Sequence, residues 1–188
     1  DNDTYQWNPG EGNDTLEAQD GADEMLYLGA NVDESIDVFA NGGRVVFFRN
    51  IATVTMDLDD VEGIEYRALG GADNIVVGDL SGTDVKPIGL DLRGPNGGGD
   101  GAADTVTVNG TQDADIIGGA GDAGGVEVTG PKAQVKVFSP EQANDRLTLN
   151  GLGGNDTVNA AWLEADGMQL TENGGLGVDV LSGSAGDD

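Results

Sequence analysis

The feature that most constrains this fold is the regular alternation of short apolar runs with turns rich in Gly, Asn and Asp. Within most runs apolar and polar residues alternate, which is the period of a β-strand, and helical periodicity is scarce. Turn clusters such as GGAD and GGND separate nearly every pair of runs. The runs that we expect to be strands are Arg44–Phe48, Ala52–Leu58, Ile64–Leu69, Asn74–Leu80, Ile88–Leu92, Asp104–Asn109, Asp115–Gly118, Val126–Thr129, Gln134–Phe138, Arg146–Asn150, Asp156–Ala160, Met168–Thr171 and Asp179–Ser182. The sequence therefore predicts an all-β protein.

Two interleaved series of similar segments indicate that these strands belong to a repeating unit. The segments of one series begin at Val54, Ile88, Val135 and Met168, and those of the other begin at Ile64, Thr105, Arg146 and Val180. Successive coils of a β-helix have this form, and no coil can bury its apolar face unless coils stack. We predict one parallel β-solenoid (β-helix) domain over residues 1–188, with a Greek-key β-sandwich as the alternative.

Three segments interrupt the regular pattern. The Gly-rich stretches 93–103 and 119–125 are expected to be loops that leave the coil. The best candidate for a helix is short and covers Ala160–Ala165.

The segment Arg44–Arg49 is the most basic and aromatic part of the chain. We expect Val46 and Phe48 to lie in the core, and the two arginines to pair with surrounding acids. Trp7 and Trp162 lie near the two ends of the sequence, where they are expected to cover the open ends of the apolar core or to contact other subunits.

The charge of the chain is strongly acidic and is concentrated in turns. The net charge is -27, and 25 of the 35 acidic residues are Asp, which favours turns where Glu favours helices. Such a charge destabilises a compact state unless it is neutralised, as bound divalent cations would do. Salt adaptation or solubility is the alternative explanation. A nucleic-acid partner is not expected, because no basic patch is present.

The absence of two residue types narrows the chemistry further. The chain contains neither Cys nor His, so its metal-binding groups are oxygens, which suit calcium rather than zinc or copper. Common general bases and nucleophiles are also few, and no serine lies in a G-x-S-x-G elbow, so we do not expect an enzyme. No apolar stretch approaches the roughly 20 residues of a membrane-spanning helix.

One nine-residue pattern carries specific chemistry. Residues 174–182 read GGLGVDVLS, and the following GSAGDD begins a second copy. Near the other end, PGEGNDTLE (9–17) and AQDGADEML (18–26) keep most of the same positions, and weaker copies are ALGGADNIV (68–76) and GLGGNDTVN (151–159). This pattern resembles the RTX (haemolysin-type) nonapeptide G-G-x-G-x-D-x-U-x, in which U is a large aliphatic residue.

The resemblance implies calcium held by turn carboxylates and carbonyls. Gly permits a close approach of backbone carbonyls, Asp supplies a carboxylate, and adjacent turns together can supply six to eight oxygens. The residues expected to bind calcium are Gly12, Asp14, Gly21, Asp23, Asp73, Asp156, Gly175, Gly177, Asp179, Gly186 and Asp188. For the interior copies the alternative is that Asp only opens a turn and the aliphatic residue begins a strand.

The resemblance also implies a secreted, often bacterial protein that folds outside the cell on binding calcium. We expect an extracellular structural module for matrix, adhesion or filament assembly, cut from a longer chain with more repeats after residue 188. The alternative is a non-catalytic accessory module of a secreted RTX enzyme or toxin. The expected partners are calcium, and either a second copy bound head-to-tail or components of the cell surface, because the best motifs lie at both ends.

Overall fold

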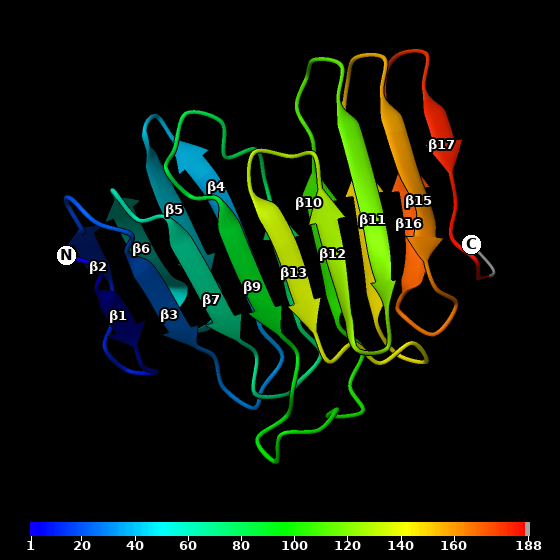
Figure 1. Ribbon diagram of the computed structural model, residues 1–188. Helices are drawn as coiled ribbons and strands as arrows, with labels where there is room; N and C mark the ends of the chain where they lie inside the picture. Colours follow the sequence, from blue (N-terminus) through cyan, green and yellow to red (C-terminus); the bar gives the residue numbers. More distant parts are fainter. Residues whose placement is uncertain (187–188) are drawn as a thin grey trace.

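The computed structural model describes residues 1–186 and confirms an all-β protein. Its regular structure there consists of seventeen strands and one 3₁₀ turn, η1 (Ile51–Thr53). The strands form two sheets that face each other around one apolar core (Figure 1).

The nine-stranded sheet is nearer the viewer in Figure 1, and its spatial order is β1 (Thr4–Trp7), β3 (Glu24–Leu28), β7 (Gly63–Arg67), β9 (Pro87–Asp91), β13 (Gln134–Phe138), β12 (Gly125–Thr129), β11 (Ile116–Asp122), β15 (Thr157–Leu163) and β17 (Val180–Ser182). The order of the eight-stranded sheet is β16 (Gln169–Asn173), β14 (Arg146–Asn150), β10 (Thr105–Asn109), β8 (Asn74–Val77), β4 (Ser35–Asn41), β5 (Arg44–Arg49), β6 (Val54–Asp59) and β2 (Asp14–Glu17).

The chain passes repeatedly from one sheet to the other, so most neighbours within a sheet are parallel. For example, β8, β10 and β14 pair in parallel, with Val106 beside Ile75 and Leu147. Two meanders supply antiparallel pairs: β4–β5–β6 in the eight-stranded sheet and β11–β12–β13 in the nine-stranded sheet. Both sheets are therefore mixed.

The core follows from the alternation of side chains along each strand. In β10, Val106 and Val108 are buried while Thr105 and Thr107 are partly exposed, as a period of two requires. Parallel stacking then aligns like residues, and one continuous cluster of buried apolar side chains results. One core extends between the two sheets, and backbone hydrogen bonds join neighbouring turns such as 151–156 and 174–179.

Two local expectations were wrong for the same physical reason. The stretch 119–125 is mostly strand, because β11 runs to Asp122 and β12 begins at Gly125. The expected helix at Ala160–Ala165 instead begins as the end of β15. A six-residue helix has few internal hydrogen bonds, whereas pairing with β11 extends the ladder to Leu163. Between β9 and β10, the expected loop at 93–103 is confirmed.

The expected orientation of β5 was also wrong. Val45, Phe47 and Arg49 are buried, whereas Val46 and Phe48 are half-buried on the other face. A shift of one residue exchanges the two faces of a strand, and here the face that carries an arginine is inside.

The expected ion pairs of both arginines are confirmed. Arg49 pairs with buried Glu34, while Arg44 pairs with Glu17, Asp57 and Asp59 at 2.9, 2.7 and 3.1 Å.

Candidate functional site

Buried carboxylates lie at the turns, immediately before the strands. An Asp followed two positions later by an aliphatic residue places both side chains on the inner face, because strand side chains alternate. Asp23, Asp73, Asp104, Asp145 and Asp156 are each at most 2% exposed. Uncompensated burial of so many acids would be very unfavourable, so their partners decide what these residues do.

Row 1 is the set Glu34, Asp73, Asp104 and Asp145, which precede β4, β8, β10 and β14 of the eight-stranded sheet. Each backbone N–H donates to the carboxylate of the next member, at 2.8 Å from Glu34 to Asp73, 2.8 Å from Asp73 to Asp104 and 3.1 Å from Asp104 to Asp145. The row therefore links four neighbouring strands of the eight-stranded sheet by charge-assisted hydrogen bonds.

Protein groups also satisfy the remaining oxygens at both ends of row 1. Glu34 pairs with Arg49 and accepts hydrogen bonds from the Tyr66 hydroxyl at 2.9 Å and the Ala30 N–H at 2.9 Å. At the other end, the second oxygen of Asp145 accepts from the Glu141 N–H at 2.7 Å. Row 1 is a polar network built into the fold.

Burial strongly disfavours the charged form of the middle members. Loss of hydration raises the pKa of Asp73 to about 8 and the pKa of Asp104 to about 7. The donating N–H groups oppose this shift, and neighbouring carboxylates add to it. At neutral pH these two side chains hold protons for much of the time, so row 1 neutralises its own charge in part.

Row 2 is the set Asp115, Asp156 and Asp179, which precede β11, β15 and β17 of the nine-stranded sheet. The Asp115 N–H donates to Asp156 at 2.8 Å, and the Asp156 N–H donates to Asp179 at 3.0 Å. The turns that carry them, 110–115, 151–156 and 174–179, stack at the upper right of Figure 1. This row brings together the predicted residues Asp156, Gly175, Gly177 and Asp179.

Glycine is required where these turns touch. Gly177 has a φ of +141°, and a Cβ on it would lie 1.5 Å from the Gly154 carbonyl oxygen. The Gly154 N–H donates to the Leu176 carbonyl at 2.9 Å, and the Leu176 N–H donates to the Leu152 carbonyl at 3.0 Å. The glycines of GLGGND and GGLGVD therefore allow two turns to hydrogen-bond backbone to backbone.

Asp156 differs from the row 1 acids in one respect. Its Oδ2 atom is buried and has no hydrogen-bond partner among the described residues. This oxygen and the Gly174 carbonyl oxygen lie 2.3 and 2.6 Å from the point that a Cβ on Gly151 would occupy. A buried oxygen without a donor is unfavourable in a carboxylate, so this position calls for a proton or a cation.

Row 3 is the set Asp3, Asp23 and Glu62, which precede β1, β3 and β7. The Asp3 N–H donates to Asp23 at 2.7 Å, and the Asp23 N–H donates to Glu62 at 2.6 Å. Asp23 is 1% exposed, and its Oδ2 also has no partner among the described residues. The predicted Gly21 belongs to the same turn, with no room for a Cβ beside the Asp1 carbonyl oxygen, 2.0 Å away.

The remaining predicted residues are dispersed. Gly12 lies in the turn between β1 and β2, and its carbonyl accepts from the Trp7 indole at 2.9 Å. Asp14 is exposed at the start of β2, on the opposite edge from Asp23. Asp73 lies in row 1, and Gly186 follows β17. Asp188 lies outside the described residues.

The candidate residues predicted from the sequence left out several members of the three rows, namely Glu34, Asp104, Asp145, Asp115, Asp3 and Glu62. For Glu34, the sequence signal that could have identified it is the spacing of five positions between a glycine and the acid that follows it. Gly29, Gly151 and Gly174 precede Glu34, Asp156 and Asp179 in this way, and a Cβ on each would lie within 2.6 Å of the carboxylate. A search restricted to Asp missed the Glu at this position.

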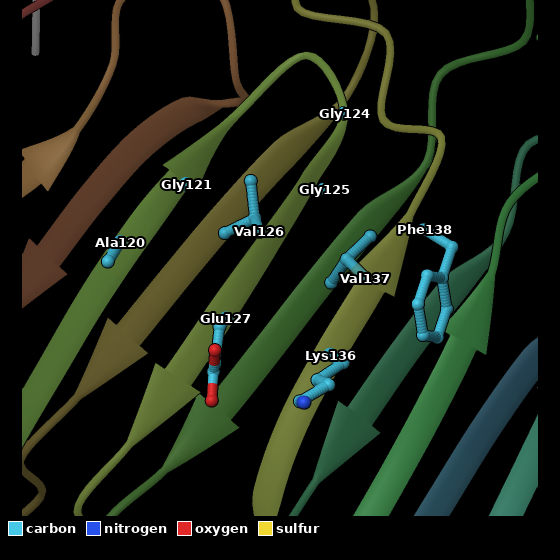
Figure 2. Close-up of a pocket in the computed structure, with 9 residues that line it drawn as sticks. All are labelled: Ala120, Gly121, Gly124, Gly125, Val126, Glu127, Lys136, Val137 and Phe138. Carbon is cyan, nitrogen blue, oxygen red and sulfur yellow. The ribbon is translucent and has the colours of Figure 1, made fainter.

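One surface hollow lies away from the three rows. Its volume is about 270 Å³. Figure 2 shows the residues that line it beside the β11–β12 turn, with Phe138 at one side and Glu127 and Lys136 on neighbouring strands. Glycines and valines line most of the rest. None of the predicted calcium residues borders it.

Within residues 1–186, no three acidic side chains converge as a ready metal cluster. A cation at row 2 would therefore take part of its oxygen shell from turn carbonyls, as calcium does. In the same residues no helix is long and apolar enough to cross a membrane. No family model, curated protein or solved structure matches the chain.

Proposed function

We propose that this chain is a calcium-binding, secreted structural module of bacterial origin, and that its two sheets are the walls of a flattened β-solenoid. The buried Oδ2 of Asp156, which lacks a donor inside the stacked turns, is the observation that carries the proposal. The resemblance of residues 151–159 and 174–182 to the RTX nonapeptide supports the same assignment.

The residues of row 2 suit a hard cation. Asp156 and Asp179 supply carboxylates, and Asp156 Oδ2 and the Gly174 carbonyl oxygen both lie beside Gly151. The chain has no His or Cys to offer a nitrogen or sulfur ligand of the usual kind. Six to eight oxygens at loose geometry describe a calcium shell. In this proposal the ion joins two successive turns, and the glycines admit it because they carry no side chain.

The function follows from linkage between binding and folding. An ion that binds only the folded chain stabilises it by RT ln(1 + [L]/Kd), or about 2.7 kcal/mol at a hundredfold excess over Kd. With a net charge of -27, the chain repels itself when compact, so each bound ion also relieves that repulsion. The module is then loosely folded at low calcium and rigid outside the cell.

Calcium titration tests this proposal directly. We expect isothermal calorimetry to detect binding and the melting temperature to rise as calcium is added to chelated protein. Asp156→Asn keeps an oxygen that can accept the Asp115 N–H but removes the charge, so it should weaken calcium binding at least about tenfold.

Asp104→Asn is the matched control, because it removes a buried Asp from row 1 and should leave the calcium affinity unchanged. Identical circular dichroism and melting temperature in chelator and in millimolar calcium would show that the proposal is wrong. Equal loss of affinity in both variants would show that row 2 is not the site.

A further inference from the structure

The two tryptophans of the chain lie in opposite environments. Trp7 is 2% exposed and its ring stacks on Tyr27 at 4.2 Å, so it belongs to the core. Trp162 is 77% exposed, so it does not cover the core. It lies in β15 beside Ala120 of β11, on the outer face of the nine-stranded sheet, while the next residue, Leu163, is buried. A ring that contributes so little to the core is free to contact a ligand.

A second exposed aromatic ring stands on the same outer face. Along β13, Val135 and Val137 are buried, whereas Lys136 and Phe138 point outward, and Phe138 is 43% exposed. Strands β12 and β11 separate β13 from β15. At about 4.8 Å per strand, the rings of Phe138 and Trp162 therefore lie roughly 15 Å apart. Both rings project from the face of the sheet, at right angles to the direction in which strands pair.

The surface between the two rings is hollowed and almost bare of side chains. The hollow of about 270 Å³ in Figure 2 has Phe138 at one side, and its floor includes Gly125 of β12 and Ala120 and Gly121 of β11. Gly125 is the cross-strand partner of Phe138, so no side chain stands beside the ring on that strand. Ala120 is in turn the partner of Trp162. The hollow therefore lies between the two rings.

Two charged side chains of opposite sign border this hollow. Glu127 of β12 and Lys136 of β13 are cross-strand partners, and both line it. The Glu127 carboxylate accepts a hydrogen bond from the Gln134 amide, which holds it in place. Lys136 makes no ion pair within residues 1–186. The border of the hollow thus offers an acceptor and a donor whose charges balance.

This combination of groups selects an uncharged sugar chain. A hexopyranose ring has a face of C–H groups that packs flat on an aromatic ring, and its hydroxyls exchange hydrogen bonds with carboxylates and amines. A polyanion would be repelled by a chain of net charge -27, and a polycation would bind the acidic turns instead. A protein interface has a packed apolar centre, whereas here glycines separate the two rings.

We propose that the outer face of the nine-stranded sheet binds a neutral polysaccharide chain that crosses β11 and β12. Sugar rings stack on Trp162 and on Phe138, and the units between them lie over the glycine floor, with hydroxyls bonded to Glu127 and Lys136. Row 2 precedes β11, whereas the hollow lies at the far end of that strand. The sugar site is therefore separate from the proposed calcium site.

Isothermal calorimetry and tryptophan fluorescence test this proposal in saturating calcium. The probes are cellohexaose, mannohexaose and xylohexaose, with an alginate hexasaccharide as the charged comparison. We expect at least one neutral probe to bind with a millimolar or lower Kd. Its binding should shift the emission to shorter wavelength, because the exposed Trp162 loses water while Trp7 is already buried. A folded chain that binds none of the neutral probes, or binds only the alginate fragment, overturns the proposal.

Single variants then locate the site. Trp162→Ala and Phe138→Ala each remove one ring and should weaken binding of the sugar by about tenfold, and Trp162→Ala should also abolish the fluorescence shift. Phe39→Ala is the matched control, because Phe39 is 44% exposed but lies in β4 of the other sheet, and it should leave the affinity unchanged. Equal weakening in the control would overturn the placement of the site. Melting temperature verifies the fold of each variant, and an unchanged calcium affinity keeps the result independent of row 2.

Discussion

Rows 1 and 2 share one hydrogen-bond pattern but differ in the partners of their remaining carboxylate oxygens. In both, the backbone N–H of one acid donates to the carboxylate of the acid that precedes the neighbouring strand. Row 1 completes its network with Arg49, Tyr66 and the Glu141 N–H, whereas row 2 leaves Asp156 Oδ2 without a donor among the described residues. The same local spacing, an acid two positions before an aliphatic residue, therefore occurs in a structural hydrogen-bond network in row 1 and in a candidate cation site in row 2.

The difference shows that a turn motif does not define a binding site by itself. A buried acid that is paired with an arginine, hydrogen-bonded to a tyrosine or protonated does not require a metal ion. A buried carboxylate oxygen that has only glycines and carbonyl oxygens around it does require a cation. These partner residues are distant in the sequence, so the tertiary structure decides which copies of the motif could bind a cation.

Removal of Arg49 should have the largest effect, because it breaks the internal neutralisation of row 1. Arg49→Met leaves Glu34 buried without its counter-ion, and we expect the free energy of unfolding to fall by about 3–5 kcal/mol. Urea denaturation at fixed calcium measures this. Arg44→Met is the control, because the ion pairs of Arg44 are partly exposed and should contribute about 1 kcal/mol or less. Equal losses in the two variants would contradict the assigned role of Arg49.

Stability should also depend on pH through row 1. The pKa of Asp73 and the pKa of Asp104 are raised in the folded state, so folding takes up protons. Their contribution is fully present below the unfolded pKa of about 3.9 and is lost as pH rises through about 7 and 8. Thermal melts in chelator should show stability falling from about pH 4 and levelling off above about pH 8, by at most about 1.4 kcal/mol per pH unit for each group.

The groups that face these two carboxyls are Glu34, Tyr66, Asp145, Asp100 and Glu141. The double variant Asp73→Asn, Asp104→Asn keeps the acceptor oxygens and removes the titration, so its stability should be flatter over the same pH range. A variant with the slope of the unmodified chain would show that the pH dependence arises elsewhere.

A smaller effect is expected from filling the space beside Asp156. In Gly151→Ala the new Cβ would meet Asp156 Oδ2 at 2.3 Å and the Gly174 carbonyl oxygen at 2.6 Å. We expect a loss of about 1–3 kcal/mol together with weaker calcium binding. Gly98→Ala, where nothing lies within 4 Å, is the matched control for the loss of a glycine. If the two variants melt alike, the close contact at Gly151 has no energetic consequence.

Much of the fold could be predicted from local pattern. The alternation in TVTVN and RLTLN fixes strands with one apolar face, and β10 and β14 follow it. Segments whose state depends on partners were not predictable, such as the Gly-rich end of β11 and the end of β15, because only pairing makes them strands. The inner face of β5 was misassigned because Arg49 is buried against Glu34, which no pattern within β5 reveals.

The sequence by itself determined that the turns carry the charge and that their acids precede strands. An Asp two positions before an aliphatic residue lies on the same face of the strand as that residue, because strand side chains alternate. Whether that face is buried depends on the rest of the chain, since Asp14, two positions before Leu16, is exposed. The tertiary structure alone decided which of those acids are satisfied. The packing of the two sheets brings Arg49 and Tyr66 to row 1 and brings only backbone to Asp156, because hydrogen-bond partners that are distant in the sequence are set by sheet register and not by local spacing.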